Sequence, residues 1–157
     1  MTHESMKETL RSMREYFNRS TRPLSEEHSG FAPQEGLYTV AGQVAHAAQT
    51  IEWFYEAAFA KDWRMDFEGM DKEVRGMTSL SQARAWFERA VEKALHETEN
   101  HSEEEWASRF PPNPIMGEAP RSSILGAVMD HTAHHRGALT VYQRLLGLKP
   151  PMPYMEG

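Results

Sequence analysis

The chain has 157 residues, of which 39% are hydrophobic and 25% are charged, and its formal net charge is -6. This length and composition predict a single domain, residues 1–157, with one hydrophobic core. Lys and Arg are scattered among Asp and Glu and form no basic stripe, so we expect no nucleic-acid partner. Because cysteine is absent, disulfides, thiolate metal ligands and cysteine nucleophiles are excluded, which fits a reducing compartment.

The opening residues, MTHESMKETLRSM, lack the basic and then apolar order of a signal peptide. The sequence also contains no run of apolar residues long enough for a membrane-spanning helix. We therefore expect a cytoplasmic protein with no membrane partner.

The first half of the chain predicts two helices. Residues 2–19 carry apolar side chains at helical spacing, and residues 36–60 form the second predicted helix. The first part of that second helix, GLYTVAGQVAHAAQTI, has no formally charged side chain, apart from any proton on its histidine. A helix so poor in charge is typically covered on more than one side, so we expect contacts with its own bundle and with a partner subunit.

The second half predicts two more helices after a long connection. Residues 61–78 mix charges with large apolar side chains at no clear period, which predicts a structured connection that could act as a lid. Ser79 or Ser81 caps a third helix over residues 80–99, and a short turn, SEEEWASRF, follows it. After the breaker PPNPIMGEAP, a fourth helix begins at Ser122 or Ser123 and ends at Leu146. Residues 148–157 are predicted to be irregular.

Four predicted helices, with no alternating strand and no internal repeat, indicate an all-α protein built as a helix bundle. The connection between the second and third helices is long enough to join parallel neighbours.

Two histidines interrupt the apolar stripe of the fourth helix. His131 and His135 are one helical turn apart and face the same way. Burying two imidazoles without partners costs on the order of 1–3 kcal/mol each, so their nitrogens need ligands or hydrogen bonds. A divalent metal ion satisfies both rings, as it does on metalloprotease helices. The alternative is a pair of hydrogen-bonded core histidines.

A third imidazole, His46, lies in the second helix on a polar but uncharged stripe with Gln43 and Thr50, which continues to Trp53. We interpret this stripe as a pocket wall, and the alternative is a solvent-exposed face. His46, His131 and His135 are therefore the predicted metal ligands, with open positions left for water or substrate, as in catalytic sites. The predicted neighbours of the site are Gln43, Thr50, Trp53, Asp130 and His134.

The predicted metal is a divalent transition ion. Zn, Ni and Fe(II) all accept imidazole nitrogen, and the sequence leaves the choice open. Thr132 stands where a zincin helix carries its glutamate general base, which disfavours protease chemistry by that route. No side chain is assigned a catalytic role.

The segments VAGQVAHAAQTIEWFY and DHTAHHRGAL resemble the DinB-like (DNA-damage-inducible) proteins, in which one histidine is followed near the C-terminus by HxxxHRG. This family of metal-binding bundles includes bacillithiol- and mycothiol-dependent transferases, and the resemblance extends over nearly the whole chain to LKPPMPY. It implies a four-helix bundle in up-down-down-up order that is often homodimeric. Ala138 departs from the family, which commonly has Gln after HRG.

Three hypotheses for function follow. In the first, the metal activates a low-molecular-weight thiol, or water, for attack on a small-molecule substrate, as in a thiol S-transferase. In the second, the protein is a non-catalytic, stress-related metal-binding homodimer that serves as a sensor, buffer or scaffold. In the third, the histidines are ordinary core residues of a bundle.

Overall fold

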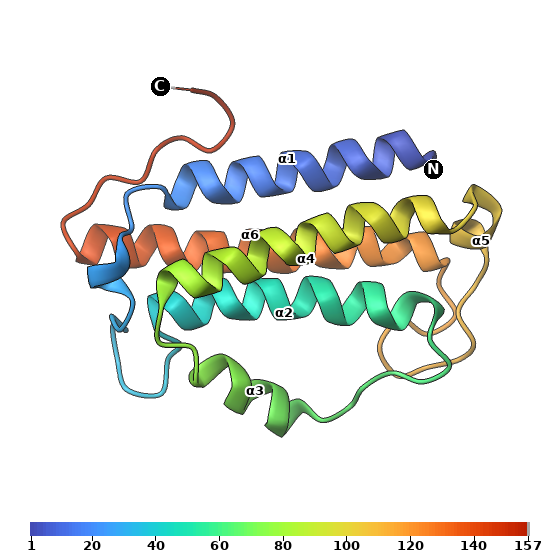
Figure 1. Ribbon diagram of the computed structural model, residues 1–157, viewed down its shortest axis with the longest axis horizontal. Coiled ribbons are helices and arrows are strands. Elements are labelled where there is room, and N and C mark those ends of the chain that lie inside the picture. Colours follow the sequence, from blue (N-terminus) through green and yellow to red (C-terminus); the bar gives the residue numbers. More distant parts are fainter. Residues whose placement is uncertain (157) are drawn as a thin grey trace.

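The computed structural model describes residues 1–156 and is all-α, with four long helices lying side by side along one axis (Figure 1). The long helices are α1 (His3–Thr21), α2 (Val40–Phe59), α4 (Leu80–Asn100) and α6 (Ile124–Leu145). In Figure 1, α1 and α6 run in one direction, and α2 and α4 run in the other. The long connection therefore joins two parallel helices, α2 and α4, which pack against each other.

Local chemistry accounts for where α2 and α4 begin and for where α6 ends. The Thr39 side chain accepts a hydrogen bond from the backbone N–H of Gly42, so α2 begins at Val40 and not at residue 36 as predicted. Ser79 caps α4 in the same way, as the sequence indicated. Gly147 follows α6 with a φ of 77°, a left-handed conformation that glycine adopts without steric cost.

The charge-poor α2 is the most buried helix of the bundle. It packs against α4, α6 and α3, and its first residues, such as Val40 and Val44, are fully buried. Its lack of charge is therefore explained by contacts within this chain. On the other side of the bundle, the rings of Phe17 and Phe87 stack with centroids 4.4 Å apart and join α1 to α4.

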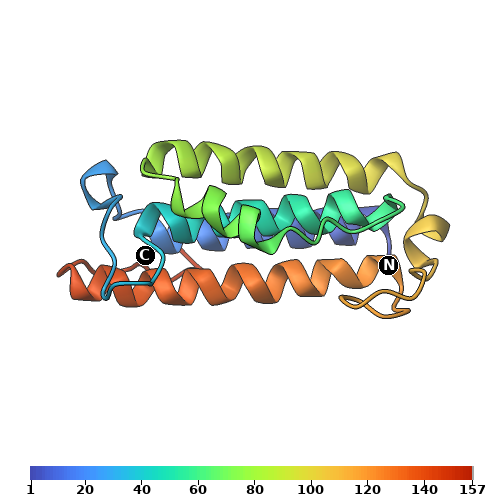
Figure 2. The same cartoon turned by 90° about the horizontal axis from the view of Figure 1, so that it is seen from below.

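The connection after α2 contains a helix that the sequence analysis did not predict. This is α3 (Phe67–Arg75), and it crosses the outer side of α2, as the view from below shows (Figure 2). The Asp66 side chain caps it by accepting from the backbone N–H of Gly69. Only Met70 and Val74 are buried, so the apolar stripe has just two members and is hidden among charged residues.

The other short elements are η1 (Glu26–His28), α5 (Glu103–Ala107) and η2 (Arg121–Ser123). α5 lies within the short turn predicted after the third helix. The tail from residue 148 to residue 156 contains no helix or strand and lies beside α1, where Arg19 donates hydrogen bonds to the Pro153 carbonyl and to Glu156 (Figure 1). Among the helices of residues 1–156, none has the length and apolar character needed to cross a bilayer.

Candidate metal site

Three imidazoles meet between α2 and α6. His46 projects from α2 and His131 and His135 from α6, and one ring nitrogen of each lies within 4.8 Å of the others. The ring centroids of His46 lie 4.9 Å from those of both His131 and His135. The structure therefore brings together the three residues that the sequence analysis selected as metal ligands.

A chain of hydrogen bonds fixes the orientation of His135. Its Nδ1 donates to the side-chain carbonyl of Gln43 at 2.5 Å, and the Gln43 amide donates to the Tyr142 hydroxyl at 3.1 Å. The Tyr142 hydroxyl in turn donates to the backbone carbonyl of Tyr38 at 2.9 Å. With Nδ1 carrying the hydrogen, Nε2 of His135 presents its lone pair to the histidine cluster.

The cluster has the donor chemistry that a divalent transition metal requires. Nε2 of His135 and Nε2 of His131 are 3.2 Å apart, close to the roughly 3.4 Å between two nitrogens of a tetrahedral zinc site. Nδ1 of His46 and Nδ1 of His131 are buried and have no hydrogen-bond partner among the described residues. Thr50 approaches His131 Nε2 only at 3.5 Å. Three imidazoles with so few partners fit a bound cation.

Burial keeps the imidazoles in the form that binds metal. Removal from water, and then the neighbouring His46 and His134, lower the pKa of His131 to about 4. Burial, and then His131 and His46, likewise lower the pKa of His135. Burial lowers the pKa of His46 as well, although the Gln49 side chain opposes this shift. At neutral pH all three rings are therefore uncharged.

A pocket of about 430 Å³ opens beside the cluster. Besides the three histidines, it is lined by residues from the start of α2, from the loop before it, from the end of α3 and from α6: Gly36, Leu37, Tyr38, Gln43, Arg75 and His134. The pocket provides room next to the imidazoles for a small molecule, which a closed structural metal site lacks.

Tyr38 and Arg75 belong to a polar group at the rim of this pocket. The Tyr38 hydroxyl donates to Asp71 Oδ1 at 2.5 Å, and Arg75 Nε donates to Asp71 Oδ2 at 2.8 Å. Burial, and then the hydrogen bond to Asp71, raise the pKa of Tyr38 to about 12. The hydrogen bonds from Tyr38 and Arg75 lower the pKa of Asp71, which therefore stays ionised.

The predicted neighbours of the site lie in different places. Gln43 and His134 line the pocket, and Thr50 contacts His131. Trp53 packs instead against Trp63, with ring centroids 5.0 Å apart, and its indole N–H donates to the Arg64 carbonyl. Asp130 is exposed on α6, where its negative charge opposes the lowering of the His131 pKa.

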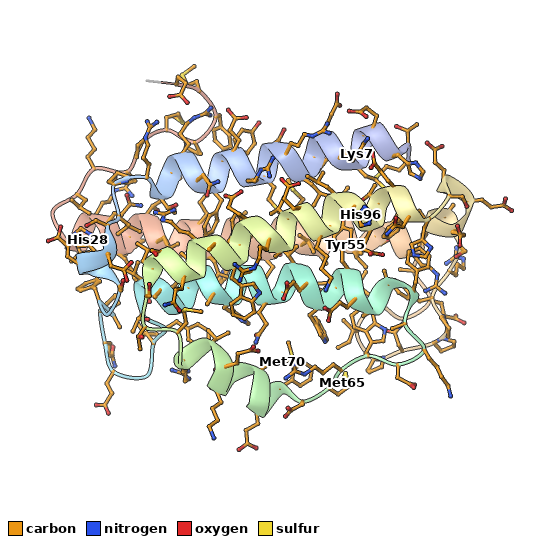
Figure 3. All side chains as sticks on the ribbon, in the orientation of Figure 1. Lys7, His28, Tyr55, Met65, Met70 and His96 are labelled. Atoms are coloured by element: carbon orange, nitrogen blue, oxygen red, sulfur yellow. The ribbon has the colours of Figure 1, made fainter. Side chains whose placement is uncertain are left out.

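Among the residues of the site that were not selected from the sequence are Tyr142, Tyr38 and Arg75. Tyr142 lies on the apolar stripe of α6 two turns after His135, and that spacing could have indicated it. Tyr38 precedes a helix, and Arg75 lies in a segment without a clear period, so no sequence pattern indicated either residue. Other histidines lie away from the cluster: His28 is in η1 and His96 on α4, toward opposite ends of the molecule (Figure 3).

The all-α fold and the three-imidazole cluster define a helical-bundle protein with a candidate metal site. A model of the DinB family matches residues 2–157, and the chain therefore belongs to the DinB family. The fold is similar to the crystal structure of a DinB-like protein from Bacillus subtilis, with a TM-score of 0.67 and 18% sequence identity over 98% of this chain and 99% of that one. None of the curated proteins matches this chain.

Proposed function

We propose that the protein is a metal-dependent thiol S-transferase that joins a low-molecular-weight thiol to a small electrophilic substrate. His46, His131 and His135 would hold a divalent ion such as Zn, Ni or Fe(II). The single observation that carries this proposal is that three neutral imidazoles meet at the side of an open pocket. A cytoplasmic location, where such thiols stay reduced, is part of the proposal.

The bound ion would lower the pKa of a thiol, or of water in a hydrolytic variant, so that the nucleophile forms at neutral pH. The chain's own residues would bind the ion and orient its ligands. The buried imidazoles offer lone pairs without first losing a proton, and Gln43 holds His135 in the required tautomer. No Asp or Glu lines the pocket, which suits thiol transfer, since a thiolate attacks without a separate general base.

The experiment is a conjugation assay with metal-loaded protein. A panel of thiols, including bacillithiol, mycothiol, glutathione and coenzyme A, is combined with electrophiles, and product formation is compared with that of the His135→Ala variant. We expect metal-dependent acceleration by the native protein and its loss in the variant. Metal binding without acceleration across the panel would favour a non-catalytic metal-binding protein, such as a sensor, buffer or scaffold.

We further propose that the four long helices form the up-down-down-up bundle implied by the family resemblance, with α3 and α5 as additions. The directions of α1, α2, α4 and α6 in Figure 1 support this proposal.

We also propose that the protein is a homodimer. Val141 and Leu145 on the outer side of α6 are 53% and 61% exposed, and a second copy would remove this apolar surface from water. Sedimentation equilibrium should give twice the 18.0 kDa mass of one chain, and Val141→Glu should shift the equilibrium toward monomer. A native protein that sediments as a monomer would contradict the proposal.

A further inference from the structure

The pocket beside the histidines has a fixed cation in its wall. Arg75, the last residue of α3, lines this pocket together with the three imidazoles. Its Nε donates to Asp71 and its Nη1 donates to the Gly36 carbonyl at 3.2 Å. Its guanidinium carbon lies 4.7 Å from the centre of the Tyr38 ring. These three contacts hold the guanidinium in place, so its orientation need not be ordered when a ligand binds.

One nitrogen of this guanidinium remains available. Nη2 of Arg75 has no hydrogen-bond partner among residues 1–156, whereas Nε and Nη1 are both engaged. The two oxygens of Asp71 accept from Arg75 Nε and from the Tyr38 hydroxyl, and neither accepts from Nη2. Nη2 therefore keeps N–H donors for an acceptor that comes from outside the chain.

The charge of the pocket selects the kind of acceptor. The chain has 23 Asp and Glu residues and a net charge of -6, yet none of the residues that line this pocket is acidic. Arg75 is the formally charged lining residue, and the Asp71 carboxylate that it contacts offsets part of its charge, so the net positive charge of the pocket would come from a cation held by the imidazoles. With a cation at the imidazoles the pocket would attract anions, and the free N–H groups of Arg75 Nη2 can donate a charge-assisted hydrogen bond to a carboxylate.

We propose that Arg75 binds a carboxylate of the thiol cosubstrate, which is therefore an anionic, carboxylate-bearing small thiol. This inference rests on the proposed function, in which the sulfur lies at the histidines and the rest of the thiol fills the adjoining pocket. The Tyr38 ring lies 5.2 Å from that of His46 and also packs against Arg75, so it connects the two ends of the binding region. Arg75 is a specificity-determining residue and takes no part in bond making.

The test measures binding and needs no turnover. Zinc-loaded protein is titrated by calorimetry with mercaptoacetate, 3-mercaptopropionate and 4-mercaptobutanoate, each paired with its neutral amide. The three chain lengths allow for different spans between the histidines and Arg75. We expect at least one acid to bind about tenfold more tightly than its amide, since a charge-assisted hydrogen bond at a half-exposed guanidinium is partly screened by water.

The variants separate Arg75 from general charge effects. Arg75→Gln should abolish the preference for the acid and leave the affinity for the amide unchanged, which also shows that the variant is folded. Arg75→Lys keeps the charge without the planar fork and should retain only part of the preference. Lys72→Gln removes a positive charge from an exposed position on the same helix and should leave the preference intact.

The outcomes distinguish this inference from the proposed function. Equal binding of acids and amides by the native protein, or a preference that persists in Arg75→Gln, would overturn the role of Arg75 while leaving thiol binding at the metal in place. If no thiol of either kind binds to the zinc-loaded protein, the proposed function fails, and this inference fails with it.

Discussion

Gln43 accepts a hydrogen bond from Nδ1 of His135 at 2.5 Å, and this contact decides which ring nitrogen faces the histidine cluster. The two residues lie on different helices, so α2 contributes both His46 and the residue that orients His135 on α6. Metal-binding histidines commonly donate their second N–H to such a partner, which fixes the tautomer and strengthens the ligand. The packing of α2 against α6, which forms part of the core, therefore also orients His135 in the candidate metal site.

Replacing this partner should weaken metal binding. In Gln43→Met, Nδ1 of His135 loses its acceptor, and the ring is free to rotate or to change tautomer. We expect zinc affinity to fall about 10- to 100-fold in a chelator competition assay. Gln143→Met is a matched control, because Gln143 is a fully buried glutamine whose amide donates to the Ser20 carbonyl, away from the cluster. An equal loss of zinc affinity in both variants would show that Gln43 affects metal binding only by stabilising the fold.

Removing single imidazoles should identify the ligands. We expect purified native protein to bind about one divalent ion per chain, and His46→Ala, His131→Ala and His135→Ala each to lower this content strongly. His134→Ala should lower it much less, because His134 is an exposed residue at the pocket rim. Elemental analysis of the four purified variants measures the effect. The same metal content in all four would refute the ligand assignment.

The stability of the metal-free protein should depend on the protonation of His131. Its pKa is about 4 in the folded protein and about 6.5 in the unfolded chain, so between these pH values the unfolded chain takes up the proton and the folded chain does not. The stability that the folded protein gains from keeping this ring neutral is therefore fully present above about pH 6.5, and it is lost as the pH falls toward 4. After a reduction for screening by solvent, we expect this group to lower the free energy of unfolding by about 1–2 kcal/mol at about pH 5 relative to pH 7.

Urea denaturation of metal-free protein at several pH values measures this dependence. His131→Asn carries no titrating group, so its free energy of unfolding should fall less steeply toward acid than that of the native protein. His96→Asn replaces an exposed histidine on α4 and should behave like the native protein (Figure 3). Identical pH profiles for native protein and His131→Asn would contradict the depressed pKa.

The sequence predicted the parts of this structure that follow from local periodicity. The four long helices carry regular apolar stripes, and His131 with His135 needed only the helical repeat to be placed on one face. His46 was selected because it stood on a stripe without charge, and the packing of α2 against α6 brings it to the other two.

The rest of the site depends on contacts between distant segments. Arg75 reaches the pocket only because α3 docks on α2 through Met70 and Val74, and no local pattern predicts that docking. Trp53 was expected near the pocket from its stripe on α2, but it packs against Trp63 of the connection instead. Helical spacing gives the direction of a side chain, whereas the tertiary fold decides which residues cover it.

The docking of α3 should be separable from the metal site. Val74 is fully buried on α3, and Val74→Ala removes two methyl groups from this contact. We expect a loss of about 1–3 kcal/mol in the free energy of unfolding. Relative to the native protein, amide hydrogen exchange should speed up more in α3 than in α4. Metal content should stay at the native level, because the three imidazoles lie on α2 and α6. Lys72→Ala changes an exposed residue of the same helix and should alter none of these three measurements. Loss of metal from Val74→Ala would show that α3 also supports the histidines, and not only the pocket wall that carries Arg75.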